Sequence, residues 1–250
     1  MSTNFYANRE SAKAYAQITF PGTYFLAFRD LPKLFHQHIH GNNALDFGCG
    51  AGRSTRFLRN CGFQAVGVDI AAEMLIKARE LDPIGDYQLI ADGDFSSLER
   101  GTYDLVLCAF PFDNIPNIRK TALLSGLAGL MKESGKMILL GSTPEIYSHE
   151  WASFSTADFR QQNMNAREGD TVRTINLAAG DQRPVDDVLC SDETYRKVFR
   201  EAGLDVLEML KPLARAEEPF SWINETRVAP WMVYVLVRAA NAIELSKSET

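Results

Sequence analysis

The sequence predicts an α/β fold in which one mostly parallel sheet carries helices on both faces. Residues 44–53 read as an apolar strand that runs through a glycine-rich turn into a helix, and strand and helix patterns alternate over residues 43–141. Such alternation favours right-handed crossovers and a parallel sheet. Because 46% of the 250 residues are apolar, the chain can bury one full core. We therefore expect a single domain over residues 1–250.

The turn has the features of a ligand-binding loop. Gly48, Gly50 and Gly52 alternate with other residues, and glycine permits both positive φ angles and the close approach of a ligand to the backbone. The helix expected over Arg53 to Asn60 begins with free N–H groups, which can hold an anionic group. This geometry is typical of a nucleotide-type site.

Two details indicate which ligand binds there. A dinucleotide-binding loop has the spacing Gly-x-Gly-x-x-Gly, and Arg53 stands where its third glycine belongs. Asp46 ends the strand two residues before the first glycine, where a buried carboxylate repels a pyrophosphate and attracts a cation. We expect a ligand that carries positive charge, which disfavours the alternative of an NAD-dependent oxidoreductase.

The stretch Leu-Asp-Phe-Gly-Cys-Gly-Ala-Gly at residues 45–52 resembles the first motif of class I S-adenosylmethionine-dependent methyltransferases. The stretches at 65–69, 87–93, 103–110 and 135–141 resemble the next four strands of that family in the same order. The resemblance implies a Rossmann-like sheet and S-adenosyl-L-methionine as the cofactor. This cofactor has an ammonium, a sulfonium and no phosphate.

The resemblance also implies a set of cofactor-binding residues. Asp69 lies roughly 20 residues after the loop, as a ribose-binding acid should. Asp92 corresponds to the acid near the adenine amine, and Ala109 ends the strand beside the transferred methyl group. The full expected set is Tyr15, Arg29, Asp46, Gly48, Cys49, Gly50, Gly52, Asp69, Ile70, Met74, Asp92, Gly93 and Ala109.

Residues 1–40 are rich in aromatic side chains, and Pro21-Gly22 divides them, which predicts two helices. They either form an amphipathic pair packed on the sheet or close over the ligand, as in the resembled family. In the second case Tyr15 flanks the methionine part of the cofactor. Arg29 then pairs with its carboxylate, which suits a guanidinium fork.

Residues 142–190 follow the fifth strand and are too many for a structureless loop, so we expect an inserted lid or extra strands over the substrate. Tyr147, Trp151 and Phe154 are spaced to share a helical face. They predict an aromatic lid that sets substrate choice and adds nothing to the stability of the sheet.

The C-terminal part of the chain predicts the end of the sheet. Residues 191–194 read as a helix start. The β-rich runs at 204–210 and 231–237 fit the antiparallel hairpin that completes the seven-stranded sheet of the resembled family. Residues 240–250 are polar and are expected to fray.

Asp113 and His149 are the candidate catalytic residues. Asp113 follows Phe110-Pro111-Phe112, which differs from the Asn/Asp-Pro-Pro-aromatic signature of methyltransferases that act on nucleic-acid bases. It falls where small-molecule methyltransferases commonly carry hydrophobic and histidine residues. A carboxylate or an imidazole assists transfer to a hydroxyl, whereas for an amine or an enol-like carbon a base is optional. We expect transfer to a nitrogen, oxygen or carbon of a small, partly aromatic molecule. The alternative is a catalytically silent protein that binds the same cofactor.

Bulk properties disfavour other classes of protein. The net charge is −6 and no basic cluster is present, which argues against a nucleic-acid partner. The sequence has no run of about 18 apolar residues, so it predicts no membrane span. The first residues lack a secretion signal, so we expect a cytoplasmic protein. Cys49, Cys61, Cys108 and Cys190 form no Cys-x-x-Cys pair, which indicates reduced thiols and no metal site.

Overall fold

A seven-stranded sheet forms the centre of the computed structural model, which describes residues 20, 22–177 and 182–239. The strand order is β3-β2-β1-β4-β5-β10-β9. The first five strands pair in parallel, and β10 is antiparallel to both β5 and β9. The predicted fold class and the C-terminal hairpin are thus confirmed. The strands are β1 (Asn43–Phe47), β2 (Gln64–Asp69), β3 (Asp86–Leu89), β4 (Tyr103–Ala109), β5 (Met131–Ser142), β9 (Leu204–Leu210) and β10 (Trp231–Arg238).

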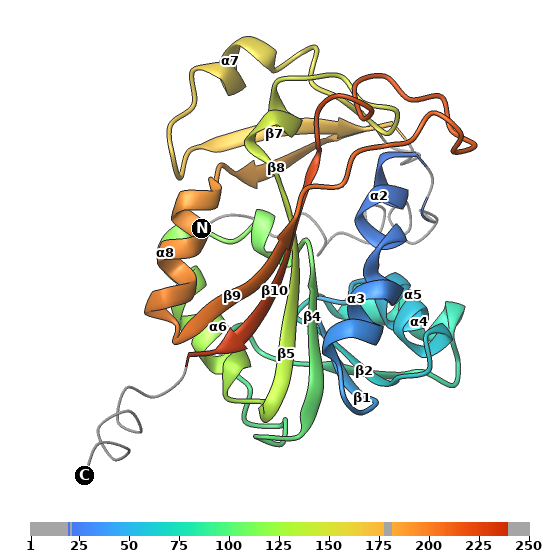
Figure 1. Cartoon of the computed structure of the whole chain (residues 1–250), viewed down its shortest axis with the longest axis vertical. Coiled ribbons are helices and arrows are strands. Elements are labelled where there is room, and N and C mark those ends of the chain that lie inside the picture. The colour runs from blue at the N-terminus through green and yellow to red at the C-terminus, as the bar shows by residue number, and fades with distance from the viewer. Residues whose placement is uncertain (1–19, 21, 178–181, 240–250) are drawn as a thin grey trace.

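Helices cover both faces of the sheet (Figure 1). One face carries α2 (Thr23–Arg29), α3 (Leu31–His38), α4 (Arg53–Asn60) and α5 (Ala72–Leu81), and the other carries α6 (Asn117–Ala128) and α8 (Asp192–Glu201). Helix α8 begins as its sequence predicts, because the Ser191 hydroxyl accepts a hydrogen bond from the Thr194 N–H at 3.2 Å. Two separate groups of buried apolar side chains fill the two sides.

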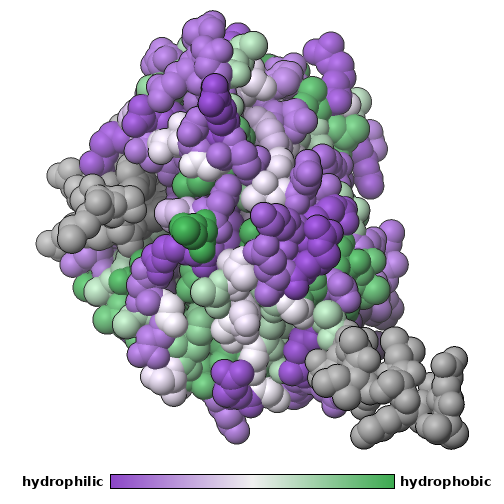
Figure 2. All heavy atoms as spheres, turned by 90° about the vertical axis from the view of Figure 1, so that its left-hand side faces the viewer, coloured by the Kyte–Doolittle hydropathy of each residue, from purple (hydrophilic) through white to green (hydrophobic). Residues whose placement is uncertain are grey.

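The face formed by α8 and α6 presents hydrophilic side chains over much of its area, with hydrophobic ones in smaller areas between them (Figure 2). This pattern is that of a solvated helical layer. Among the described residues, none of the helices combines the length and the apolar character needed to span a bilayer.

The described parts of the segment 142–190, residues 142–177 and 182–190, form a second structural layer above the carboxyl ends of the parallel strands (Figure 1). A small antiparallel sheet in the order β6-β7-β8 is its main part. The layer consists of η3 (Pro144–Tyr147), β6 (Phe154–Ser155), α7 (Arg160–Met164), β7 (Thr171–Asn176) and β8 (Pro184–Val188). The expectation of extra strands here is confirmed. A further 3-10 turn, η2 (Pro111–Asp113), follows β4 beneath this layer.

The aromatic residues of the insertion do not share a helical face, so that prediction was wrong. Tyr147 lies in η3, Trp151 in a loop and Phe154 in β6. The Trp151 side chain is fully buried, and its indole N–H donates to the Ile146 carbonyl at 2.8 Å. All three rings belong to the core that contains the first strands of the sheet. The expectation that this layer adds nothing to stability is therefore corrected.

The N-terminal segment has one more break than the sequence predicts. Gly22 precedes α2, as the Pro21-Gly22 break predicts, but Asp30 then separates α2 from α3. Pro32 lies in the first turn of α3, where its missing N–H costs no hydrogen bond. The part of the predicted first helix before Phe20, with Tyr15, lies outside the described residues.

Glu225 joins α2, the insertion and the link between β9 and β10. Its fully buried carboxylate accepts hydrogen bonds from the Thr23 hydroxyl and the Ala152 N–H, both at 2.7 Å. The backbone N–H groups of Ile223 and Asn224 donate to its other oxygen at 2.9 and 3.1 Å. Four donors and no acceptor form an environment that suits a carboxylate.

We expect Glu225→Gln to destabilise the fold, because an amide NH2 cannot accept the bonds that one carboxylate oxygen accepts. The loss of hydrogen bonds to a charged group corresponds to about 1.5–3 kcal/mol. Thermal unfolding of the variant, compared with the exposed control Glu217→Gln, measures this. Equal melting temperatures for the two variants would contradict it.

Candidate cofactor and substrate site

The loop between β1 and α4 turns on three glycines with positive φ angles, 71° at Gly48, 53° at Gly50 and 75° at Gly52. The N–H groups of Gly48 and Cys49 both donate to the Val68 carbonyl of β2. A Cβ atom at Gly48 would lie 2.6 Å from Cβ of Pro111, which is two residues after the end of β4. The loop therefore needs glycine there for its conformation and for the close approach of the next strand.

Asp69 at the end of β2 is held against this loop. Its Oδ2 accepts a hydrogen bond from the Gly50 N–H, and its Oδ1 accepts one from the Ala71 N–H, both at 2.8 Å. Burial raises the pKa of Asp69, and these backbone bonds oppose the rise. Because each carboxylate oxygen has a further acceptor site, the fixed group can still accept two hydroxyl donors.

Asp46 lies fully buried at the end of β1. Its Oδ2 accepts hydrogen bonds from the hydroxyls of Ser54 at 2.7 Å and Thr55 at 2.6 Å, whereas its Oδ1 has no hydrogen-bond partner among the described residues. Burial raises the pKa of Asp46 to about 6, so the carboxyl is mostly ionised at neutral pH.

An unpartnered buried carboxylate oxygen favours a cationic donor over a phosphate. Together with Asp69, which can accept hydroxyl donors, it makes a set of hydrogen-bond acceptors that fits S-adenosylmethionine. Asp46 disfavours a dinucleotide, because a buried carboxylate at the loop repels a pyrophosphate. The residues present thus fit the cofactor that the sequence resemblance implies.

Other predicted cofactor residues gather at the same place. Met74 is buried, and its Cε lies 2.9 Å from the position of a Cβ at Gly50. Ile70 is exposed beside Asp69, and the buried Cys49 has a thiol pKa raised well above its ordinary value, first by burial. Ala109 ends the neighbouring strand β4.

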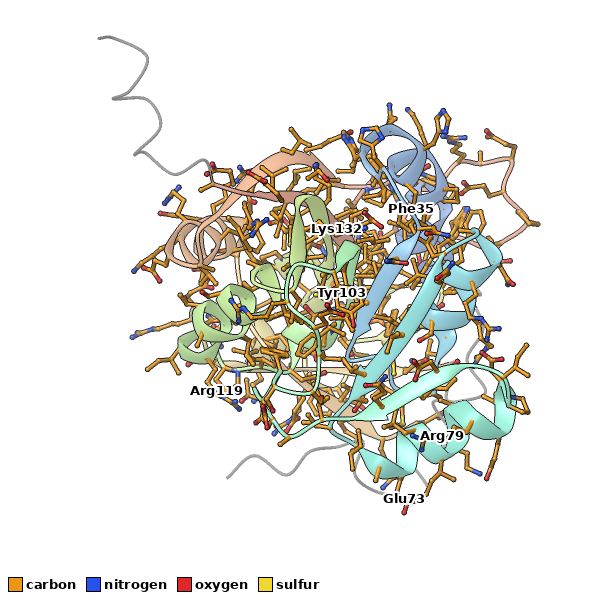
Figure 3. All side chains as sticks on the ribbon, turned by 90° about the horizontal axis from the view of Figure 1, so that it is seen from below. Phe35, Glu73, Arg79, Tyr103, Arg119 and Lys132 are labelled. Carbon is orange, nitrogen blue, oxygen red and sulfur yellow. The ribbon has the colours of Figure 1, made fainter. Side chains whose placement is uncertain are left out.

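Two of the predicted cofactor-binding residues, Asp92 and Arg29, form ion pairs with other residues of the protein. Asp92 forms a bidentate ion pair with Arg119 of α6, labelled in Figure 3, at 2.7 and 2.9 Å, and this bond lowers its pKa. Arg29 pairs with Asp30 at 2.8 Å and Glu218 at 2.7 Å. The charge of Arg29 is thus balanced by two carboxylates of the protein, which disfavours pairing with the cofactor carboxylate. Gly93 follows Asp92 with a φ of 78°.

Arg53 has a role that the sequence did not reveal. Its guanidinium carbon lies 4.4 Å from the ring centroid of Tyr24, and the rings of Phe20 and Phe28 lie at 5.2 and 5.6 Å. Such contacts are cation–π interactions. They join the first residue of α4 to helix α2 and to Phe20. The loop before α4 is therefore held against the N-terminal helices.

A cavity lies between the carboxyl ends of β4 and β5 and the small sheet. Aromatic rings form one side and polar groups the other. It is lined by Tyr24, Phe110, Asp113, Asn114, Ser142, Ile146, Phe154, Thr174, Asn176, Val185, Asp187 and Trp231. Ligands bind at this edge in open α/β sheets.

Asp113 of η2 reaches the cavity as a buried carboxylate. It accepts hydrogen bonds from the Ser142 N–H at 3.1 Å and from the Ser142 hydroxyl at 2.7 Å. Burial raises the pKa of Asp113, the Ser142 bonds oppose the rise, and Lys120 opposes it further. A carboxyl whose pKa is raised by burial is suited to proton transfer.

His149 does not line this cavity. Its Nδ1 lies 3.0 Å from the Glu145 carbonyl oxygen and 3.1 Å from the Ser148 hydroxyl, and its ring packs 5.8 Å from that of Trp151. These are local contacts of a loop histidine. Of the two candidate catalytic residues, the structure brings only Asp113 to the cavity.

Several cavity residues were missed from the sequence, among them Phe110 and Asp187. Phe110 adopts a φ of 71°, which an aromatic residue rarely does and which costs about 1–3 kcal/mol. Asp187 lies on the inward face of β8, opposite the outward Asp186. The period-2 alternation of Val185 and Asp187 could have identified this inward carboxylate, had the strand been recognised.

Comparisons with known proteins agree with this geometry. The profile of a methyltransferase domain family matches residues 44–135. A ubiquinone biosynthesis O-methyltransferase from Burkholderia ambifaria is 33% identical over 104 residues, which are 40% of this chain and 44% of that protein. The match therefore spans less than half of that relative's length.

Solved structures show the same fold. A structure described as an S-adenosylmethionine-dependent methyltransferase from Listeria monocytogenes has a TM-score of 0.61 at 16% identity and covers 92% of this chain and 100% of that one. A 1,6-didemethyltoxoflavin-N1-methyltransferase from Burkholderia thailandensis, with its substrate and S-adenosylhomocysteine bound, has a TM-score of 0.54 at 13% identity. It covers 86% of this chain and 79% of that one.

Proposed function

We propose that this chain, which carries a class I S-adenosylmethionine-dependent methyltransferase domain, transfers a methyl group to a small, partly aromatic molecule. The observation that carries the proposal is the joint geometry of one edge of the sheet. There, the Asp69 carboxylate is fixed on the Gly50 N–H. Asp46 offers an unpartnered oxygen, and a cavity with a buried carboxylate lies beside the next strand.

The cofactor-binding residues follow from that geometry. We assign Asp69 to the two ribose hydroxyls, Asp46 and the loop from Gly48 to Gly52 to the methionine part, and Met74 and Ile70 to the adenine. Asp92 accepts two bonds from Arg119, and with Gly93 it borders the same edge. We also assign Cys49 and Ala109 to the lining of the cofactor site.

Methyl transfer from this cofactor requires few catalytic groups from the protein. The bound cofactor supplies a methyl group already activated by a positive sulfur. The chain must then align the acceptor with that methyl and exclude water, and we assign the second task to the layer that residues 142–190 contribute above the strand ends. Asp113 faces the cavity and can take the proton that the acceptor loses.

Incubation of the protein with methyl-labelled S-adenosylmethionine and a panel of small aromatic amines, phenols and indoles tests the proposal. Label transfer to a panel member, with stoichiometric S-adenosylhomocysteine, is the expected result. Cofactor binding without transfer to any class would favour a silent binding protein instead.

We expect Asp113→Asn to lower kcat about 10²–10⁴-fold with any acceptor that must lose a proton, because the amide cannot accept it. The affinity for S-adenosylhomocysteine should change little, since Asp113 belongs to the acceptor cavity. His149→Gln is the matched control and should retain activity. A reversal, with the His149 variant inactive and the Asp113 variant active, would assign the base to His149.

A further inference from the structure

The polar side of the cavity contains two carboxylates from different layers of the molecule. Asp113 comes from η2 at the end of β4, and Asp187 comes from β8 of the small sheet. Both side chains are buried, at 6% and 9% exposure, and both line the cavity. Two buried carboxylates in one small space repel each other unless cations balance them.

The partners that the protein supplies to these carboxylates are neutral. Asp187 accepts hydrogen bonds from the Asn114 amide at 2.7 Å and the Tyr147 hydroxyl at 3.2 Å. Asp113 accepts hydrogen bonds from the Ser142 N–H and hydroxyl, and the Tyr195 hydroxyl also helps to lower its pKa. Among the described residues, neither carboxylate forms an ion pair with a lysine, arginine or histidine. Each keeps acceptor capacity for a ligand.

Lys120 opposes the raised pKa values of both carboxyls. Its ammonium is fully buried, has no hydrogen-bond partner in the described chain and lies 4.7 Å from the Tyr195 ring centroid. The Tyr195 hydroxyl is buried close by, since a Cβ at Gly141 would lie 3.3 Å from it and 3.4 Å from Asp113 Oδ1. Burial raises the pKa values of Asp113 and Asp187, and repulsion between the two carboxylates raises that of Asp187 further. A cationic group bound between them would relieve that repulsion and favour the ionised form of both.

The opposite side of the cavity also favours a cation. The rings of Phe110 and Trp231 lie 4.7 Å apart, and the ring of Phe154 lies 5.6 Å from that of Trp231. Aromatic faces attract ammonium groups, most strongly where water is excluded. The cavity volume of about 40 Å³ has room for a head group of a few atoms.

We propose that the acceptor molecule is an amine, which enters as an ammonium and is bound by Asp187 and Asp113 between these aromatic rings. The proposal rests on the proposed methyltransferase function and names its substrate class. Asp187 is a binding residue for the ammonium, and Asp113 takes one proton from it. The neutral nitrogen then forms a bond to the methyl carbon with its lone pair. The electron pair of the broken carbon–sulfur bond stays on sulfur, and the methylated product leaves as an ammonium.

Titration calorimetry of the full chain with benzylamine, benzyl alcohol and 4-methylphenol tests the inference. Each titration is made with and without saturating S-adenosylhomocysteine. At neutral pH benzylamine carries the charge that its alcohol analogue lacks. We expect the amine to bind at least about tenfold more tightly than the alcohol, because it forms hydrogen bonds between charged groups.

Asp187→Asn should remove this preference and leave the affinity for S-adenosylhomocysteine unchanged. The matched control is Asp186→Asn, because Asp186 lies outside on the same strand and pairs with Arg173. Equal or undetectable binding of amine and alcohol by the unmodified protein overturns the inference, as does tighter binding of 4-methylphenol. Either result leaves the methyltransferase proposal intact if S-adenosylhomocysteine binds, and failure of S-adenosylhomocysteine to bind overturns that proposal separately.

Discussion

Asp69→Ala is expected to weaken S-adenosylhomocysteine binding by about 3–6 kcal/mol, which is roughly a 10²–10⁴-fold rise in Kd. The physical reason is the loss of two hydrogen bonds between ribose hydroxyls and a charged carboxylate that is already fixed by Gly50 and Ala71. Because the group is preorganised, little of the binding energy is spent on ordering it. Calorimetry with S-adenosylhomocysteine measures the change.

The matched control for Asp69 is Asp86→Ala, since Asp86 is an exposed carboxylate on the neighbouring strand β3. This variant should bind like the unmodified protein. Circular dichroism of both variants should show a native fold. An Asp69 variant with native fold and unchanged Kd would remove Asp69 from the cofactor site.

Trp151→Ala is expected to destabilise the protein by about 3–5 kcal/mol, because it empties a fully buried site of indole size. In a chain of this size each kcal/mol lowers the melting temperature by about 2–4 °C. The substitution also leaves the Ile146 carbonyl without its indole donor. Thermal unfolding followed by circular dichroism measures the loss.

Trp151→Phe serves as the comparison variant, because it keeps most of the apolar volume but removes the indole hydrogen bond. Its cost should be nearer about 1–3 kcal/mol. If Trp151→Ala melted like the unmodified protein and altered only the kinetics, the prediction of an aromatic lid that adds nothing to the stability of the sheet would be right.

The loop and the main sheet could be predicted from the sequence because their signals are local. Gly48, Gly50 and Gly52 each adopt the positive φ that their spacing predicts. Helix α4 spans Arg53–Asn60 as expected, since its glycine-rich start and apolar face lie within a few residues. The acids at strand ends, Asp46 and Asp69, were found because a charge that follows a buried strand is unusual.

The substrate cavity could not be predicted because it depends on contacts between distant segments. Trp151 is core because Ile146 and the sheet surround it, and its spacing from Tyr147 and Phe154 misleadingly suggests a helix. The partners of Arg29 include Glu218, which is 189 positions away. Asp187 meets Asn114 across 73 positions. Such pairs are set by how the small sheet folds back over the strand ends, which no local pattern specifies.

Calorimetry with S-adenosylhomocysteine and with NAD on the unmodified protein tests the central claim most directly. The claim is that the loop of Gly48 to Gly52, with Asp46 and Asp69, is built for a cationic nucleoside without phosphates. We predict one S-adenosylhomocysteine bound per chain and no measurable NAD binding at the same concentration. Binding of NAD as tight as that of S-adenosylhomocysteine, or no binding of S-adenosylhomocysteine, would contradict the account.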